Sequence, residues 1–183
     1  MFGHTNEPVT LQRDVTAIII PVGEPVTLRE GAVGFLTQAL GGSFTIYVEG
    51  NLFRIAGTDA AAIGKEPEPP PAIPENATDA DIESVIWNQL TTVYDPEIPV
   101  NIVDLGLIYD LSIEDAGEDA RRVEVKMTLT AQGCGMGPVI ADDARTRIEA
   151  MPGVESAQVE IVWEPPWNPR MISDEGKKVL GLE

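Results

Sequence analysis

The chain divides at Lys65-Glu66-Pro67-Glu68-Pro69-Pro70-Pro71-Ala72-Ile73-Pro74-Glu75, and this stretch decides how its 183 residues fold. Its prolines lack backbone N–H donors and alternate with charged residues, so the segment favours an extended polyproline conformation over a helix or a paired strand. We therefore predict a semi-rigid linker at residues 65–77, a small domain at residues 1–64 and a second domain at residues 78–183.

Residues before the linker follow a period of two, which is typical of strands with one buried face. The predicted strands cover 15–20, 33–40, 44–49 and 52–55, with glycines between them. Gly50-Asn51 suits a tight hairpin turn that needs positive φ. We predict a small all-β, barrel-like domain. Helical spacing also fits from Arg29 to Leu40, but two glycines within that stretch disfavour a helix.

After the linker the period changes to that of a helix, and the second domain is predicted to be α+β. Thr78 is a plausible N-cap for a helix that runs to about Val93. Strands are then expected at 107–113 and 123–129, a helix at 138–151, and a third strand from Val154 to Trp163. The order α-β-β-α-β predicts two helices packed on one face of a three-stranded mixed sheet.

Composition and charge narrow the function. The chain has 43% hydrophobic residues and a formal net charge of −18. Such an acidic surface repels phosphate backbones and anionic headgroups, so we expect neither nucleic acid nor a membrane as a partner. No apolar run approaches the length of a membrane-spanning helix and no leader is recognisable, so we expect a cytoplasmic protein.

The cysteine and histidine counts exclude several kinds of site. Cys134 is the single cysteine, so an internal disulfide is impossible, and His4 is the single histidine. A histidine-based metal site or a histidine-driven catalytic triad is therefore excluded. Most hydrolase chemistry is excluded with them.

The first candidate site is a proline-stiffened loop at residues 94–109. Asp95, Glu97 and Asp104 lie there among apolar residues. Acidic side chains in such surroundings either belong to a site or bond loop amides, as Asp does in turns. Both interpretations of these carboxylates stay open from the residues alone.

The second candidate is the glycine-rich segment at 128–138, which contains Thr130 and Cys134. The segment leads from a predicted strand into a predicted helix. Backbone amides at a helix start stabilise a thiolate, so the pKa of Cys134 is expected to lie below that of a free thiol. Cys134 is then a nucleophile or a ligand for a soft metal. The alternative is a buried structural cysteine, the commoner role of a lone cysteine.

The third candidate is the Trp- and Pro-rich segment at 162–173. It is interpreted either as a rigid lid that packs Trp163 and Trp167 over the core or as a partner-binding surface. Ser173 then reads as the N-cap of a short terminal helix.

Taken together, these segments resemble a known family. The family is the small α/β domain shared by the phenylacetate-pathway protein PaaD, the eukaryotic cytosolic iron–sulfur targeting factor and bacterial SufT. The match covers about residues 78–172 and rests on a long signature, Asp95-Pro96-Glu97-Ile98-Pro99-Val100-Asn101-Ile102-Val103-Asp104-Leu105-Gly106-Leu107-Ile108-Tyr109. The Gly133-Cys134-Gly135-Met136-Gly137-Pro138 loop, the Trp163–Trp167 ending and the added N-terminal β-domain resemble the SufT branch in particular. Other branches have a proline directly after the cysteine, where this chain has Gly135.

The resemblance implies an auxiliary, non-catalytic factor in iron–sulfur protein maturation that acts with SUF assembly proteins and client apoproteins. Its site would contain Cys134 as metal ligand, with Asp95, Asp104, Thr130 and Glu97 around it. A stable cluster normally needs four thiolates, so a single cysteine argues against a permanent cofactor. Transient binding of iron or a cluster needs a homodimer that contributes two Cys134 thiolates, or ligands from a client.

Two other functions stay open from the residues. A cysteine-dependent enzyme would need a base, and only the three carboxylates of the first loop are candidates for that role. A pure adaptor would recruit clients to the SUF machinery through the Trp/Pro segment and the β-domain, with a structural Cys134.

Overall fold

The computed structural model describes residues 6–96, 98–133 and 135–182. The chain forms two compact units, Met1–Pro69 and Pro70–Glu183, and the division between them falls within the proline-rich stretch. No helix or strand is assigned between residues 64 and 78. The finer boundaries of the linker, 65 and 77, stay a prediction.

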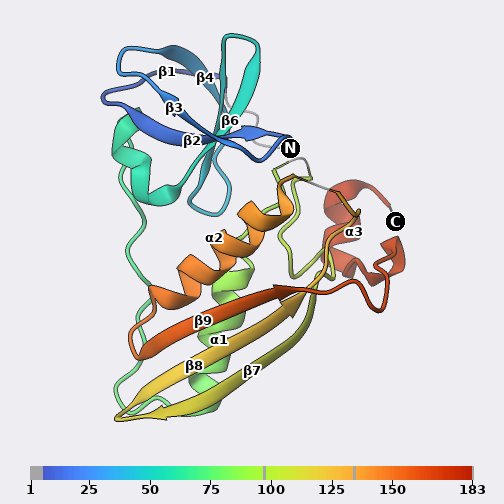
Figure 1. The fold of residues 1–183 in the computed structure, drawn as a ribbon. Helices are drawn as coiled ribbons and strands as arrows, with labels where there is room; N and C mark the ends of the chain where they lie inside the picture. The colour runs from blue at the N-terminus through green and yellow to red at the C-terminus, as the bar shows by residue number, and fades with distance from the viewer. Residues whose placement is uncertain (1–5, 97, 134, 183) are drawn as a thin grey trace. The chain divides into compact units, whose positions relative to one another are not determined.

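The first unit is a six-stranded antiparallel sheet followed by a 3-10 helix (Figure 1). Its strands are β1 (Glu7–Thr10), β2 (Val15–Ile20), β3 (Pro25–Leu28), β4 (Val33–Gln38), β5 (Phe44–Val48) and β6 (Asn51–Ile55). The 3-10 helix η1 spans Gly57–Ile63. Apolar side chains from alternate positions form a core that includes Leu11, Ile46 and Ile55, each 2% exposed or less.

The predicted barrel is not closed. The strands lie in the order β1-β4-β5-β6-β2-β3, so β1 and β3 are the two edges of an open sheet. Closure requires the first and last strands to pair along their length. Each of these edge strands has only four residues, and each pairs with a single neighbour.

Residues 33–38 are a strand, which decides against the helical alternative for this stretch. Gly34 in β4 shows why a glycine stands there, since a Cβ at this position would overlap the carbonyl oxygen of Tyr47 in β5. The glycine therefore permits close strand pairing, whereas in a helix it would only reduce stability.

The hairpin between β5 and β6 turns one residue earlier than predicted. Val48 pairs with Asn51, so the two turn residues are Glu49 and Gly50, with φ of 47° and 91°. Two central residues with positive φ match the right-handed twist of the flanking strands. Asn51 belongs to β6.

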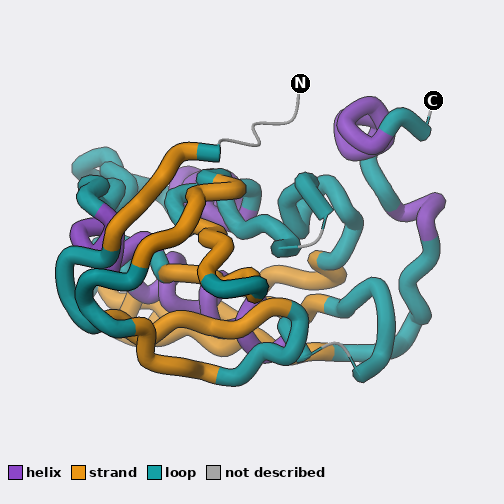
Figure 2. Tube along the Cα trace, turned by 90° about the horizontal axis from the view of Figure 1, so that it is seen from above, coloured by secondary structure: helices purple, strands orange, loops and turns teal. Residues whose placement is uncertain are grey.

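The second unit has the predicted α-β-β-α-β order and mixed sheet. Its elements are α1 (Asp79–Leu90), β7 (Ile108–Gly117), β8 (Ala120–Met127), α2 (Gly137–Glu149) and β9 (Val154–Ile161). β7 and β9 flank β8, antiparallel and parallel to it respectively. A long loop then leads to η2 (Pro169–Met171) and α3 (Asp174–Leu180) at the C-terminal end, as Figure 2 shows.

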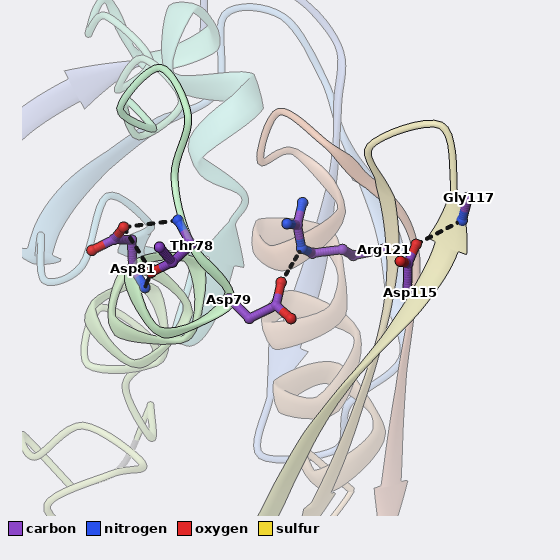
Figure 3. Close-up of polar contacts among 6 residues, drawn as sticks. All are labelled: Thr78, Asp79, Asp81, Asp115, Gly117 and Arg121. Atoms are coloured by element: carbon purple, nitrogen blue, oxygen red, sulfur yellow. Dashed lines mark hydrogen bonds and ion pairs between the residues drawn. The ribbon is translucent and has the colours of Figure 1, made fainter.

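The start of α1 follows the sequence prediction. Thr78 accepts a hydrogen bond from the backbone N–H of Asp81, whose carboxylate in turn accepts from the backbone N–H of Thr78 (Figure 3). The hydroxyl of Thr78 also donates to this carboxylate, over 2.9 Å. The bond from the backbone N–H of Thr78 and, after it, the bond from the hydroxyl lower the pKa of Asp81 below its ordinary 3.8. Arg121 of β8 bonds Asp79 with 2.8 Å between Nε and Oδ1, which joins the first turn of α1 to the sheet.

The two faces of the three-stranded sheet differ in character. Along β8, Val123, Val125 and Met127 are buried, and the alternate residues are exposed. Apolar residues of α1 and α2 are buried with them, namely Ile82, Ile86, Leu90, Ile140, Ala144 and Ile148. The core of this unit therefore lies on one face, and the opposite face carries Arg122, Glu124 and Lys126 of β8.

Candidate functional site

The signature loop, residues 93–107, is folded back on itself and packed into the core. Tyr94 and Asn101 form an isolated antiparallel bridge, and the backbone N–H of Ile102 donates to the carbonyl of Val93 over 2.9 Å. Ile102 and Leu105 are fully buried. The described part of this loop is thus packed into the second unit, and the polar side chains of Asp95, Asn101 and Asp104 have defined partners.

Asn101 organises the end of this loop. Its Oδ1 accepts hydrogen bonds from the backbone N–H groups of Val103, at 3.0 Å, and Asp104, at 2.9 Å. Its Nδ2 donates to Oδ2 of Asp104 over 2.7 Å. Asn101 therefore makes the bonds to loop amides that were considered for Asp104.

Asp104 faces the C-terminal segment. Its Oδ1 accepts a hydrogen bond from the hydroxyl of Ser173 over 2.7 Å, and its carbonyl accepts from the backbone N–H of Ser173 over 2.8 Å. The same Ser173 oxygen accepts from the backbone N–H of Gly176, as the N-cap of α3. Both carboxylate oxygens of Asp104 are thus engaged in holding the loop and α3 together.

Three further contacts tie the C-terminal segment to the signature loop. The indole N–H of Trp167 donates to the carbonyl of Leu105 over 2.7 Å, and the hydroxyl of Tyr109 donates to the carbonyl of Pro165 over 2.6 Å. Gly106 has a φ of +75°, and a Cβ there would overlap the carbonyl oxygen of Met171. Trp167 is thus half-buried and bonded to the signature loop, whereas Trp163 is 37% exposed, and the choice between a lid and a partner-binding surface stays open.

Asp95 is the other described carboxylate of the loop. Only 8% of the residue is exposed, and its Oδ1 accepts from the backbone N–H of Ile98 over 3.2 Å. This is the loop-amide role that was weighed for it. Glu97, which lies between Asp95 and Ile98 in the sequence, is outside the described residues.

The cysteine loop leaves the sheet beside the signature loop. The backbone N–H of Thr128, which follows β8, donates to the carbonyl of Leu107 over 2.8 Å. Thr130 lies in the next bend and is half-buried. Cys134 lies outside the described residues. The fold thus brings the chain leading into Cys134 to the end of the loop that carries Asp95 and Asp104.

Close packing fixes where the cysteine loop ends. Met136 is 1% exposed, and a Cβ at Gly137 would overlap the side chain of Leu129. By contrast, Gly133 is exposed and has free space around it. The loop is therefore anchored after the cysteine position and open before it.

Thr128, Asn101 and Ser173 were not predicted as site residues. Thr128 is fully buried, and its Oγ1 is one of two buried side-chain atoms without a hydrogen-bond partner in the described part of the chain. Asn101 precedes Asp104 by three residues, a spacing that indicates a side-chain-stabilised turn. No sequence signal could have joined Ser173 to Asp104, because they lie 69 residues apart.

The described residues were compared with the requirements of a metal site and of a membrane-spanning helix. Outside positions 97 and 134 and the chain ends, no three His, Cys, Asp or Glu side chains gather closely enough to hold a metal ion. Among the helices of residues 6–182, none is long and apolar enough to cross a membrane.

Comparison with known proteins gives consistent results. A model of the iron-sulfur cluster assembly protein family matches residues 83–161. An "Fe-S protein maturation auxiliary factor" from Porphyromonas gingivalis is 46% identical over 100 residues, which cover 55% of this chain and 91% of that protein. The "Fe-S protein maturation auxiliary factor SufT" from Staphylococcus aureus is 42% identical over 90 residues, which cover 49% of this chain and 98% of that protein.

A solved structure agrees with the fold of the matched part. The crystal structure of a domain of unknown function from Bacillus anthracis superimposes with a TM-score of 0.51 at 33% identity, over 57% of this chain and 95% of that one. The relatives thus span about half of this chain, while the match covers nearly all of their own length. Because the family model matches residues 83–161 and relatives at 42–46% identity match almost end to end, the chain belongs to the iron-sulfur cluster assembly protein family.

Proposed function

We propose that the protein is an auxiliary factor in iron–sulfur protein maturation that assists the transfer of a cluster or iron to client apoproteins. The names of its relatives support this role. Within the molecule, the observation that carries it is the bond between Thr128 and Leu107. This bond brings the chain that leads into Cys134 beside the loop that carries the carboxylates.

Cys134 is the proposed point of attachment for the transferred iron or cluster. A thiolate is the normal ligand of iron–sulfur clusters, and stable clusters usually have four of them. One thiolate per chain therefore suits a cargo that is held briefly and passed on. The remaining ligands would come from a second copy of the chain or from the client, and the protein would catalyse no reaction of its own.

The roles proposed for the neighbouring residues differ. Asp95, Glu97 and Thr130 would lie around the cargo, and Asp104 would support the loop through its bonds to Asn101 and Ser173. The two bonds hold the Asp104 carboxylate in one orientation, between the signature loop and α3. We therefore give Asp104 a positioning role and propose the other three as contacts.

A complementation experiment tests this function. A strain that lacks its own maturation factor of this family receives the wild-type chain, Cys134→Ser or the exposed control Ser156→Ala, and iron–sulfur enzyme activities are measured under high demand for clusters. We expect the wild type and Ser156→Ala to restore activity and Cys134→Ser to fail. Restoration by Cys134→Ser would overturn the cysteine-dependent mechanism.

The adaptor function is a second candidate, favoured by the exposed Trp163 in a segment held rigidly against the loop. Here the protein would bring SUF assembly proteins and clients together without touching the cargo. Anaerobic purification of the wild type and Cys134→Ser, with iron and sulfide analysis, separates the two functions. Cysteine-dependent iron supports transfer, whereas iron-free protein that still restores activity supports the adaptor.

A further inference from the structure

A cleft of about 610 Å³ lies in the second unit, apart from the residues proposed to contact the cargo. It is formed by Gly106 of the signature loop, Tyr109 of β7, Lys126 of β8, and Val162, Glu164, Pro165 and Met171 of the C-terminal segment. Its volume falls within the range of roughly 300–1,000 Å³ that is typical of ligand clefts. Its walls are mostly apolar, and it is open to solvent.

The walls of this cleft are held in place by the contacts between loop and segment. The hydroxyl of Tyr109 is bonded to the carbonyl of Pro165, so its ring presents apolar surface to the cleft. Gly106 and Met171 meet so closely that only glycine fits at position 106. A cleft with fixed walls loses little conformational entropy when a partner binds.

Lys126 connects the cleft to the exposed face of the sheet. It lies between Asp110 of β7 and Glu160 of β9 in the strand register, so two carboxylates are its cross-strand neighbours. Directly opposed side chains on one face are within about 5 Å of each other at their Cβ atoms. The positive charge of Lys126 is therefore compensated before any partner arrives.

The surroundings of the cleft are negative. The exposed face that carries Lys126 also carries Asp110, Glu124 and Glu160, and Glu164 lies in the cleft lining. Residues 76–183 contain eight basic and twenty-one acidic residues. A field of this sign attracts basic segments and disfavours acidic ones.

We propose that this cleft docks an extended peptide segment of a partner protein, with an apolar side chain packed against Tyr109 and Met171, which contact each other, and basic side chains flanking it. The segment would bind at the end of β8 from which the chain continues to Thr130. This interaction goes beyond the proposed maturation function and needs neither iron nor Cys134.

Nuclear magnetic resonance titration of the full-length, 15N-labelled chain tests the proposal. The probes are three capped nonapeptides on one Gly/Ser scaffold, with a central Leu flanked by Arg, a central Ser flanked by Arg, or a central Leu flanked by Glu. We expect the Arg–Leu–Arg peptide to shift the amides of Gly106, Tyr109, Lys126 and Val162. Its affinity should exceed that of each control by about tenfold or more, because each control lacks either the apolar burial or the charge attraction.

Two surface variants test the charge argument with the same peptide. Glu164→Gln should weaken binding by about threefold and Lys126→Gln should strengthen it by a similar factor, while Glu114→Gln, distant along β7, should leave it unchanged. Equal affinities of the Leu and Ser peptides would show that only electrostatic attraction holds them, and would overturn the proposal that the cleft binds an apolar side chain. Shifts at the same amides on dilution without peptide would assign the surface to a second copy of the chain and overturn the peptide partner.

Failure of the docking proposal can be distinguished from failure of the proposed maturation function. Peptide binding is measured on iron-free protein, whereas complementation depends on Cys134. A chain that complements but shows no peptide binding loses only the docking proposal.

Discussion

Asp104 accepts a hydrogen bond from the hydroxyl of Ser173, 69 residues further along the chain, with 2.7 Å between Oδ1 and Oγ. Ser173 simultaneously caps α3 through the backbone N–H of Gly176. One hydroxyl therefore joins the signature loop to the C-terminal helix. The position of the loop depends on a segment that the family model, which ends at residue 161, does not include.

Replacement of Ser173 should release this connection. Ser173→Ala removes both an N-cap and a donor to a carboxylate, so we expect the second unit to lose about 1–2 kcal/mol of unfolding free energy. Urea denaturation measures the loss, and amide exchange should become faster at Gly176. Ser156→Ala, on an exposed position of β9, is the matched control. Equal stability of the two variants would contradict the role given to Ser173.

Gly106 should tolerate no side chain. Gly106→Ala adds a Cβ that overlaps the carbonyl of Met171, at a φ of +75°. Gly117→Ala is the control, because Gly117 has a φ of +85° and open space around it. The control should cost about 1–2 kcal/mol for the left-handed backbone alone, and Gly106→Ala should cost at least about 1 kcal/mol more. Thermal and urea unfolding compare the two, and similar losses would show that the contact with Met171 is easily relaxed.

The reciprocal hydrogen bonds between Thr78 and Asp81 at the start of α1 should make the free energy of unfolding depend on pH in the acid range. The native pKa of Asp81 lies below 3.8 because its carboxylate accepts hydrogen bonds from Thr78. A depressed native pKa adds stability that is present above the unfolded value and is lost as the pH falls through the native pKa. The difference in unfolding free energy between wild type and Asp81→Asn should therefore shrink as the pH is lowered below 3.8. Ser156→Ala, which is exposed on β9 and removes no titratable group, is the control and should show no such trend.

Replacing Asp95 or Asp104 by Asn tests whether the negative charge of the signature loop matters for function beyond its effect on stability. Asn can accept the backbone hydrogen bond that Ile98 donates to Asp95, so Asp95→Asn should cost no more than about 1 kcal/mol of stability. The two carboxylate oxygens of Asp104 accept from the side chains of Asn101 and Ser173, and an amide has only one oxygen, so Asp104→Asn should cost about 1–2 kcal/mol. If the charge serves the site, at least one variant should lower iron–sulfur enzyme activity in the complementation strain. Full activity of both would remove the carboxylates from the site and leave Cys134.

Limited proteolysis should separate the two units. The proline-rich stretch contains no helix or strand, so its backbone is the expected point of first cleavage. We expect a stable fragment that begins between Ile73 and Asp79 and unfolds cooperatively on its own. First cleavage between Leu107 and Leu129, within the paired strands β7 and β8, would contradict the division.

The sequence by itself determined the local structure of this protein. The cap at Thr78, the strand of residues 15–20 and the order of elements after the linker all depend on neighbours within a few positions. Interactions between residues so close in the sequence can be predicted from residue type and spacing. The two short edge strands β1 and β3 were not predicted from the sequence, and the curvature of the whole sheet decides that they do not pair with each other.

Only the tertiary structure decided what the site residues contact. The sequence placed Asp95, Asp104, Thr130 and Cys134 in two loops, and both interpretations of the carboxylates were open. In the structure, Asp104 accepts a hydrogen bond from Ser173, and Asn101 accepts the hydrogen bonds from the loop amides. These partners are set by the long-range return of the C-terminal segment, and contacts between residues so far apart in sequence carry no local signal from which they could be read.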